Sequence, residues 1–279
     1  MQSAAAMPEG LVLPGGLVLD EGHLLKDAEL RPLTGREEEW LAASPAPPSA
    51  IATTRLLSSC LVRLGDAKPS KQLVRRLLVG DRDYLILQVR RATFGDEFHG
   101  VLACPACGGK MDVSFDTRDV PVTFRPQTVT NHSIQLDSAG RAERTVRFRL
   151  PCGADQEAVL GYDTSEAAEL LLDRCVLDSG GVPLSLDERE AIANAMDGLA
   201  PQIDLELDLT CPECEKQFSA PFDTTAFFFS EMKINGRQLL HEIHSLAFYY
   251  HWSEAEIVRL PRDRRRAYLG LLSDALHQE

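Results

Sequence analysis

Hydrophobic and polar positions along this chain follow both strand-like and helix-like periods. Between residues 11 and 33, short apolar runs are separated by turns rich in glycine and acidic residues, which is typical of short strands. Residues 84–91 predict a helix and residues 94–103 an extended segment. One helical face is predicted from apolar residues at helical spacing, namely Leu57, Cys60, Leu61 and Leu64. The pattern therefore predicts an α+β fold.

The same pattern restarts after residue 120. Leu30-Arg31 recurs as Phe148-Arg149 and Gly35 as Gly153, each 118 residues later. The apolar face that contains Cys60 recurs around Cys175, and the charged triplet at residues 81–83 recurs at residues 188–190. The offset falls from 118 to 115 and then to 107 residues, which indicates a duplicated unit whose second copy has shorter loops. We therefore predict two tandem pseudo-symmetric repeats, residues 1–120 (the first repeat) and residues 121–225 (the second repeat).

Residues 226–279, the C-terminal segment, have no counterpart in the first repeat by this comparison. Residues 227–250 predict a helix that continues through Gly236. Ser253 and Glu256 form a capping box that opens another helix, and Pro261 starts the last one, where its missing N–H does no harm. The C-terminal segment is therefore expected to be helical.

Each repeat ends in a Cys-Pro-x-Cys knuckle. Cys104 and Cys107 form the first knuckle, and Cys211 and Cys214 form the second. In both copies a Phe-Asp-Thr motif begins eleven residues after the first cysteine, at Phe115 and Phe222. One knuckle supplies half of a tetrahedral four-cysteine zinc shell, and the duplication brings a second. We expect one zinc ion per chain, and because protein ligands fill the shell, we expect it to be structural.

A Cys-x-x-Cys pair can also be a redox dithiol, although that chemistry depends on a thiolate stabilised at a helix N-terminus. The remaining cysteines carry no such pattern. Cys60 and Cys175 lie on apolar faces and are expected to be buried, and Cys152 is given no role. His241, Glu242 and His244 do not form a metal-binding H-E-x-x-H motif, because the fifth residue is Ser245.

Composition narrows the function classes further. The formal net charge of −13 disfavours binding to phosphate backbones or anionic membranes, and no apolar run has the length of a membrane span. The seven cysteines and the lack of a secretory signal at the N-terminus predict a cytoplasmic protein. No catalytic triad, phosphate loop or dinucleotide motif is present, so we expect no enzyme activity.

Two features of the C-terminal segment suggest partner binding. A basic cluster (Arg259, Arg262, Arg264, Arg265 and Arg266) follows an aromatic group (Phe227, Phe228, Phe229, Phe248, Tyr249, Tyr250 and Trp252). The arginines are expected to form a solvated helix face, with a docking patch as the alternative. Because aromatic residues and arginine anchor protein interfaces, residues 248–279 are a candidate docking surface.

Several segments resemble the T-even phage baseplate hub assembly chaperone family of contractile phage tails and injection systems. They lie in order at residues 30–38, 78–83, 94–98 and 104–107. The resemblance covers about residues 25–115, and the second repeat departs from it because it lacks the Gly-Asp-Arg and aromatic-Gly steps. The resemblance implies a non-enzymatic assembly chaperone or minor baseplate component that binds baseplate or hub proteins. The alternatives are a zinc-ribbon nucleic-acid-associated or regulatory protein and a thiol-disulfide enzyme.

Overall fold

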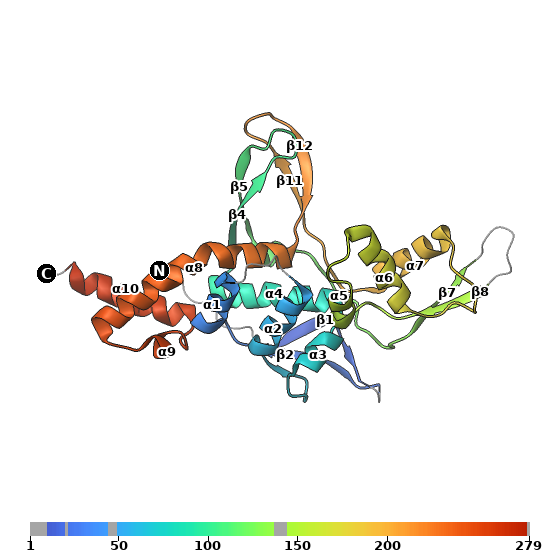
Figure 1. The fold of residues 1–279 in the computed structure, drawn as a ribbon, viewed down its shortest axis with the longest axis horizontal. Helices are drawn as coiled ribbons and strands as arrows, with labels where there is room; N and C mark the ends of the chain where they lie inside the picture. Colours follow the sequence, from blue (N-terminus) through green and yellow to red (C-terminus); the bar gives the residue numbers. More distant parts are fainter. Residues whose placement is uncertain (1–9, 20–21, 44–48, 137–143, 278–279) are drawn as a thin grey trace.

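The computed structural model describes residues 10–19, 22–43, 49–136 and 144–277, without the side chains of residues 233–235. The molecule is elongated. The C-terminal helices form one end, the first repeat lies in the middle and the second repeat forms the other end (Figure 1). Two β-hairpins rise side by side from the middle of this body.

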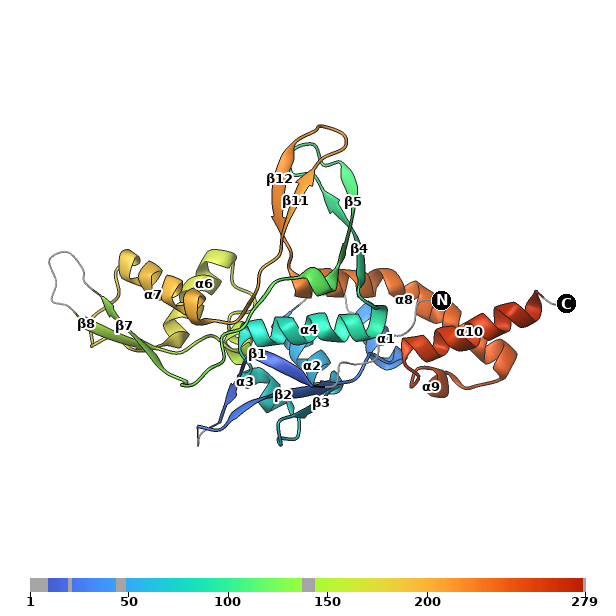
Figure 2. The same ribbon diagram turned by 180° about the vertical axis from the view of Figure 1, so that it is seen from behind.

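The first repeat combines a small antiparallel sheet, of strand order β1-β2-β3, with helices and a hairpin. Helix α4 crosses this sheet, as Figure 2 shows from behind. Its elements are β1 (Leu11–Val18), β2 (Leu24–Leu30), α1 (Gly35–Ala43), α2 (Ala50–Cys60), β3 (Leu61–Leu64), α3 (Lys71–Arg76), α4 (Val79–Phe94), β4 (Glu97–Ala103), β5 (Lys110–Asp116) and the 3₁₀ helix η1 (Thr117–Asp119).

The second repeat follows nearly the same order, with the sheet β7-β8-β9 and the hairpin β11–β12. The short strands β6 and β10 pair with each other, and β10 contacts α4 of the first repeat. Its elements are β6 (Val122–Thr123), β7 (His132–Leu136), β8 (Arg144–Phe148), α5 (Gly153–Ala158), α6 (Thr164–Cys175), β9 (Val176–Asp178), α7 (Leu186–Leu199), β10 (Gln202–Ile203), β11 (Glu206–Thr210) and β12 (Gln217–Pro221). The predicted α+β fold class is confirmed, and the division at residues 120 and 225 stays our interpretation of the repeated order.

The equivalence of the two repeats extends to single contacts. The Arg31 N–H donates to the Cys60 carbonyl at 2.8 Å, and the Arg149 N–H donates to the Cys175 carbonyl at 2.9 Å. In both sheets the register shifts at the same place, beside residue 30 and beside residue 148. Corresponding residues therefore occupy corresponding positions in three dimensions.

An arginine–carboxylate pair closes the start of the first helix in each repeat. Arg31 binds Glu37 at 2.8 Å, and Arg149 binds Asp155 at 2.6 Å. The same carboxylates accept the backbone N–H of the residue that precedes the helical glycine, Thr34 or Cys152. An acidic side chain in this position satisfies an N–H group that the helix itself leaves unpaired. We call these two helix starts the glycine turns (residues 33–36 and 151–154).

One predicted helical face is wrong in its second half. Helix α2 ends at Cys60, and Leu61–Leu64 forms strand β3, whose two end residues are buried. The spacing of leucines at residues 57, 61 and 64 fits a helix, but the chain leaves the helix to pair with β2. The pairing of β3 with β2 joins residues that are far apart in the sequence, and the spacing of apolar residues gives no information about such a contact.

The C-terminal segment contains nearly all of α8 (Thr224–Tyr250), which begins two residues before it, together with α9 (Glu254–Ile257) and α10 (Arg262–Leu276). Helix α8 packs on α1 and α4 of the first repeat. A Cβ atom at Gly236 would lie 2.4 Å from the Cβ of Ala42, so this glycine permits the close crossing of α8 and α1. Phe228, Phe229 and Met232 are buried in the core of the first repeat. The start of the predicted helical segment thus belongs to that core.

The expectation that the arginine cluster is a solvated face is wrong for two of its members. Arg265 is fully buried and binds both Glu38 at 2.8 Å and Glu242 at 2.9 Å. Arg262 is 3% exposed and binds Glu38 at 3.1 Å. These residues join α10 to α1 and α8, so they stabilise the fold and are closed to a partner. In the aromatic group of the C-terminal segment, Phe248 and Tyr249 are exposed.

None of the helices among the described residues is both long enough and apolar enough to span a bilayer.

Candidate metal centre

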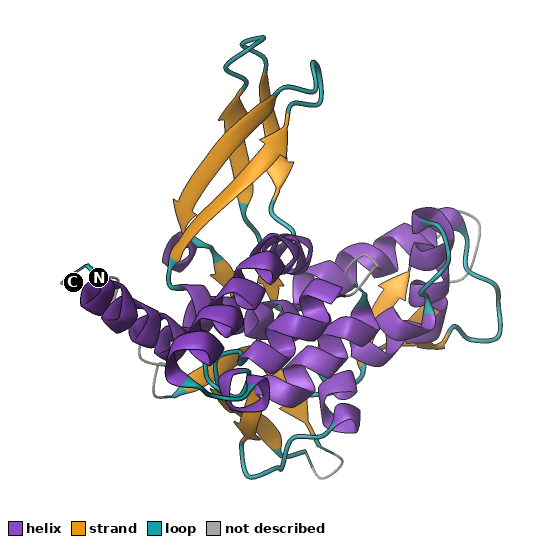
Figure 3. Ribbon diagram, turned by 60° about the vertical axis from the view of Figure 1, so that its left-hand side comes forward, coloured by secondary structure: helices purple, strands orange, loops and turns teal. Residues whose placement is uncertain are grey.

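The four knuckle cysteines lie at the tips of the two projecting hairpins. Strands β4 and β5 pair from Glu97 with Asp116 to Ala103 with Lys110, and β11 and β12 pair in the same way in the second repeat. The hairpins stand together above the helical body (Figure 3). Cys104 and Cys211 are buried at the tip together with apolar residues from both hairpins, whereas Cys107 and Cys214 are exposed. The two knuckles, 104 residues apart at Cys107 and Cys211, therefore share one site.

Each knuckle is the same tight turn. The Cys104 N–H donates to the Gly109 carbonyl, and the Cys104 carbonyl accepts the Gly108 N–H. Cys211 makes the same two bonds in the second knuckle. The residue after the second cysteine has a positive φ in both copies, +74° at Gly108 and +58° at Glu215. This conformation suits glycine and is unfavourable for glutamate, so Glu215 is held there by the turn.

The sulfur atoms have the spacing of a tetrahedral shell. Cys104 Sγ lies 3.7 Å from Cys214 Sγ, and Cys107 Sγ lies 3.6 Å from Cys211 Sγ. All four lie within 4.8 Å of one another. Four sulfurs that each lie about 2.3 Å from a zinc ion are about 3.8 Å apart. The cluster can therefore hold one metal ion with two ligands from each repeat.

The electrostatics of the cluster also favour a cation. The N–H groups of Cys107 and Ala106 point at the Cys104 sulfur and lower the pKa of this thiol to about 6. The Gly109 N–H lowers the pKa of Cys107, but its contacts with Cys214 and the other thiols outweigh this and raise the pKa to about 12. Four sulfurs this close cannot all ionise against their mutual repulsion. A bound cation would remove that repulsion.

The Phe-Asp-Thr motifs join the hairpins to the body. The equivalent rings of Phe115 and Phe222, one from each repeat, pack edge to face, and their centroids are 5.0 Å apart. Asp116 accepts the Arg118 N–H at the start of η1, and Asp223 accepts the Ala226 N–H at the start of α8. The motif thus serves as an aromatic contact followed by a helix cap in each repeat.

The other cysteines lie away from this cluster. Cys60 and Cys175 are fully buried, which confirms their predicted place in the core. Burial raises the pKa of both thiols to about 12. Cys152, which had no predicted role, is the N-cap of α5, and its Sγ donates to Asp155 at 3.2 Å.

The residues of the His-Glu-Ile-His segment do not gather as metal ligands in the described structure. Glu242 instead binds the buried Arg265. Arg265 also binds Glu38, and the sequence analysis missed this group of ion pairs. Glu38 is 227 residues from Arg265, so no local pattern joins them.

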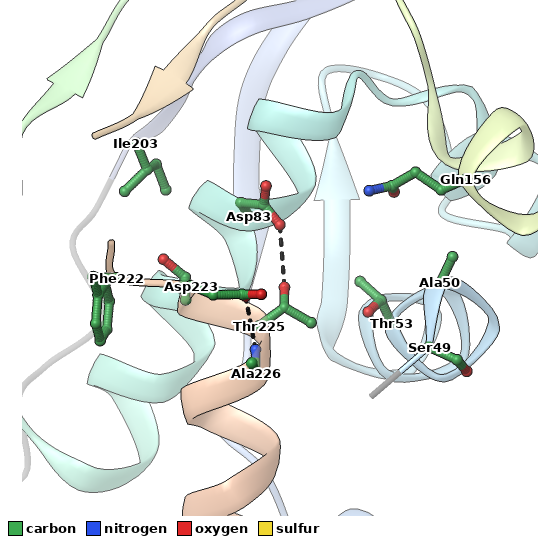
Figure 4. A pocket seen from close by; sticks show the side chains of 11 residues that line it. Ser49, Ala50, Thr53, Asp83, Gln156, Ile203, Phe222, Asp223, Thr225 and Ala226 are labelled. Atoms are coloured by element: carbon green, nitrogen blue, oxygen red, sulfur yellow. Dashed lines mark hydrogen bonds between the residues drawn. The ribbon is translucent and has the colours of Figure 1, made fainter. Parts of the chain in front are cut away.

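A cavity of about 530 Å³ lies where both repeats meet the start of α8 (Figure 4). Two carboxylates face it, and both are engaged. Asp83 accepts a hydrogen bond from Thr225 at 3.1 Å, and Asp223 caps α8. Burial and, to a smaller extent, the nearby charge of Asp223 raise the pKa of Asp83 to about 6, against the hydrogen bond from Thr225 that lowers it. These groups hold the start of α8 against α4, which accounts for their presence in the cavity.

Comparison with known proteins identifies a family. The family model described as T4 bacteriophage base plate protein matches residues 21–178, more than half of the chain. No curated protein and no solved structure matches this chain. The match extends beyond the expected residues 25–115 and into the second repeat as far as residue 178. The matched region contains the first knuckle and ends before the second. The chain thus belongs to the T4 bacteriophage base plate protein family.

Proposed function

We propose that this chain is a non-enzymatic assembly chaperone or minor structural component of the baseplate of a contractile phage tail-like injection system. Family membership over residues 21–178 is the observation that carries this proposal. Its partners would be baseplate or hub proteins, and it would act in the cytoplasm or become part of the particle. The elongated body supports such a role because it exposes a large surface to neighbours (Figure 1).

The cysteine cluster would bind one zinc ion per chain, with Cys104, Cys107, Cys211 and Cys214 as ligands. Thiolates are soft ligands that favour zinc, and a four-cysteine shell leaves no open position for a substrate. The ion would therefore be structural. By joining the two hairpin tips it would hold the repeats in one arrangement.

A dithiol function is less well supported. The closest sulfur contacts run between the hairpins, from Cys104 to Cys214 and from Cys107 to Cys211. A redox Cys-x-x-Cys pair instead reacts within one motif, beside a helix N-terminus that lowers the pKa of its thiolate. Both knuckles here lie at hairpin tips.

Nucleic-acid binding by the hairpins is disfavoured by their charge. Residues 97–116 and 206–221 contain seven acidic residues and two lysines. Phosphate contacts require a basic face, and this projecting surface is acidic. Docking through residues 248–279 stays a prediction, in which Phe248 and Tyr249 are the exposed aromatic residues that would contact a partner.

Deletion of the gene from its host, followed by electron microscopy of the tail-like particles, tests the proposed function. We expect particles without a normal baseplate, and restoration by the wild-type gene. Normal baseplates in the deletion strain would contradict the proposal. Mass spectrometry of purified particles then separates the two forms of the proposal, because a structural component is retained and a chaperone is absent.

Cysteine variants connect this test to the metal. Cys104→Ser and Cys211→Ser should fail to restore assembly. Cys152→Ser is a matched control, because Cys152 lies outside the cluster and serine is a favourable N-cap residue. Loss of assembly in the control alone would point to a defect unrelated to the cluster.

A further inference from the structure

Three helices of the chain begin in the same way. Each carries an arginine as its fourth residue, and the N–H of that arginine donates to the N-cap carbonyl in the bond that opens the helix. The N-cap and arginine pairs are Leu78 with Arg82 in α4, Ser185 with Arg189 in α7, and Pro261 with Arg265 in α10. The α4 and α7 starts correspond through the repeat. The α10 start is a third copy of the same local structure.

The start of α4 docks on the glycine turn of the second repeat. Leu78 forms a β-bridge with Cys152, and the Gly153 N–H donates to the Leu77 carbonyl at 3.0 Å. Leu78 also packs against the core of the second repeat. A Cβ atom at Gly153 would lie 2.2 Å from Nη1 of Arg82. Only glycine admits this close approach without displacement of the arginine.

The start of α10 makes the same contact with the glycine turn of the first repeat. Pro261 forms a β-bridge with Thr34, and the Gly35 N–H donates to the Leu260 carbonyl at 3.4 Å. A Cβ atom at Gly35 would lie 2.8 Å from the Cα of Val258. The chain therefore uses one docking contact twice.

In both contacts the arginine is buried and faces acidic side chains of the docked helix. Arg265 binds Glu38 of α1 at 2.8 Å. Arg82 donates to Thr54, whose hydroxyl donates to Glu157 of α5. Each docked surface thus offers a glycine at the first helical position and a carboxylate within the next turn.

The start of α7, unlike those of α4 and α10, has no such neighbour among the described residues. None of them donates a hydrogen bond to the Leu184 carbonyl, which corresponds to the docked carbonyls of Leu77 and Leu260. The first helical residue is buried in α10, where Arg262 is 3% exposed, but Leu186 of α7 is 80% exposed. Nη1 of Arg189 is buried and has no hydrogen-bond partner among the described residues, while Nη2 donates to Asp173 at 2.7 Å.

This exposed start is held in place by its own repeat. Arg144 donates to the carbonyls of Ser179 and Val182 at 3.0 Å and binds Glu188 at 2.7 Å. Val182, whose carbonyl Arg144 holds, is itself 42% exposed. The result is a fixed edge, residues 182–189, which exposes Val182 and Leu186 and which we call the docking edge.

The order of the contacts along the molecule indicates what covers this edge. The C-terminal segment docks on the first repeat, the first repeat docks on the second, and the second repeat forms the end of the body (Figure 1). We propose that the docking edge continues this series by binding a different baseplate protein, through a helix that begins at a glycine and carries a carboxylate in its first two turns. This inference rests on the proposed baseplate role. A second copy of this chain does not fit, because both of its glycine turns are already occupied.

Site-specific photo-crosslinking tests the proposal. A photoreactive amino acid replaces Leu186 in one full-length protein and Leu240 in another, and each is co-expressed with the tail proteins encoded beside the chain, one at a time. Leu240 is a matched control, because it is a helical leucine that is 63% exposed on α8. The proposal predicts a crosslink from position 186 to a partner peptide with a glycine helix start and an acidic first turn, and none from position 240. A crosslink to a second copy of the chain, or to a peptide without that glycine, would overturn it.

The variant Leu186→Asp provides an affinity measurement. The substitution places an acidic residue in the first turn of α7, where the helix dipole favours it, so the fold is preserved. We expect the Kd for that partner to rise about tenfold or more, and Leu240→Asp to leave it unchanged. A complex that forms with unchanged affinity in Leu186→Asp would overturn the docking edge and leave the baseplate role intact. Absence of a complex with every tail protein would overturn both.

Discussion

The first repeat is covered at both of its ends, whereas the second repeat is covered at one. The C-terminal segment docks on the glycine turn of the first repeat, and the start of α4 in turn covers the glycine turn of the second repeat. The start of α7 remains exposed. Arg82 is 1% exposed, while its counterpart Arg189 has 27% of its side chain exposed. Equivalent residues therefore differ in burial because of their neighbours, although their local structure is the same.

The comparison also separates what is shared from what is specific to one repeat. Both repeats keep the sheet register, the arginine–carboxylate pair at the glycine turn and the cysteine knuckle. Only the first repeat has the additional helix α3 among the described elements, and only its core receives side chains from α8. The shared features are those that two copies need in order to fold and to meet at a common cysteine cluster.

The largest expected effect is loss of the ion from either repeat. Cys104→Ser and Cys211→Ser should each abolish zinc binding and lower the melting temperature to a similar extent, because each removes one ligand of the same shell. Binding of structural zinc contributes about 10–16 kcal/mol in small zinc peptides, and a larger domain depends on it less. Melts with and without a chelator measure this. Early melting of Cys104→Ser with wild-type behaviour of Cys211→Ser would show that the knuckles do not share an ion.

The next effect concerns the arginines at equivalent helix starts. Arg265→Met should lower the free energy of unfolding by about 3–5 kcal/mol, because it leaves the carboxylates of Glu38 and Glu242 buried without their cation. Arg189→Met should cost less than about 1 kcal/mol, because its partner Asp173 is 53% exposed. Urea unfolding of both variants measures the difference. Equal losses would contradict the claim that the neighbour decides what the arginine contributes.

Alanine substitutions at the glycine turns should be destabilising in both repeats. Gly35→Ala and Gly153→Ala each place a Cβ atom within 2.8 Å of a docked atom, so we expect a loss of about 1–3 kcal/mol. Gly198→Ala is the control, because a Cβ atom there meets nothing within 4 Å and alanine favours the helix by about 1 kcal/mol. A gain in stability at Gly35 or Gly153 would show that the docking contacts are loose.

The smallest effect is a pH dependence of the Arg149–Asp155 pair. Burial raises the pKa of Asp155, but its bonds with Arg149 and with Cys152 outweigh this and hold the pKa well below the ordinary value. The pair therefore stabilises the fold above about pH 4, the ordinary pKa of aspartate, and this contribution is lost as the pH falls further. Asp155→Asn should be less stable than wild type at pH 7, and the difference should shrink on acidification. A constant difference would contradict a role for the ionised carboxylate.

Much of this fold could be predicted from local patterns. The knuckles and the ordered recurrence of motifs between the repeats are features of the sequence itself, and the structure brings Cys104, Cys107, Cys211 and Cys214 together as expected. The strand β3 was missed, because leucines at residues 57, 61 and 64 also fit a helix and the pairing with β2 is a distant contact. The buried pairs of Arg265 were missed for a similar reason, since an arginine cluster has the same sequence whether it is solvated or paired. The start of α10 shares little more than Arg265 with the starts of α4 and α7, which is too little for a sequence pattern to detect.

The central claim is that two copies of one unit meet at a single metal ion with two ligands from each copy. Elemental analysis of the purified full-length protein, combined with its molar mass in solution, tests this claim most directly. The account predicts one zinc ion per chain in a monomer, and none in either Cys104→Ser or Cys211→Ser. No zinc, two zinc ions per chain, or one zinc ion per chain found only in an oligomer whose knuckles pair between chains would contradict it.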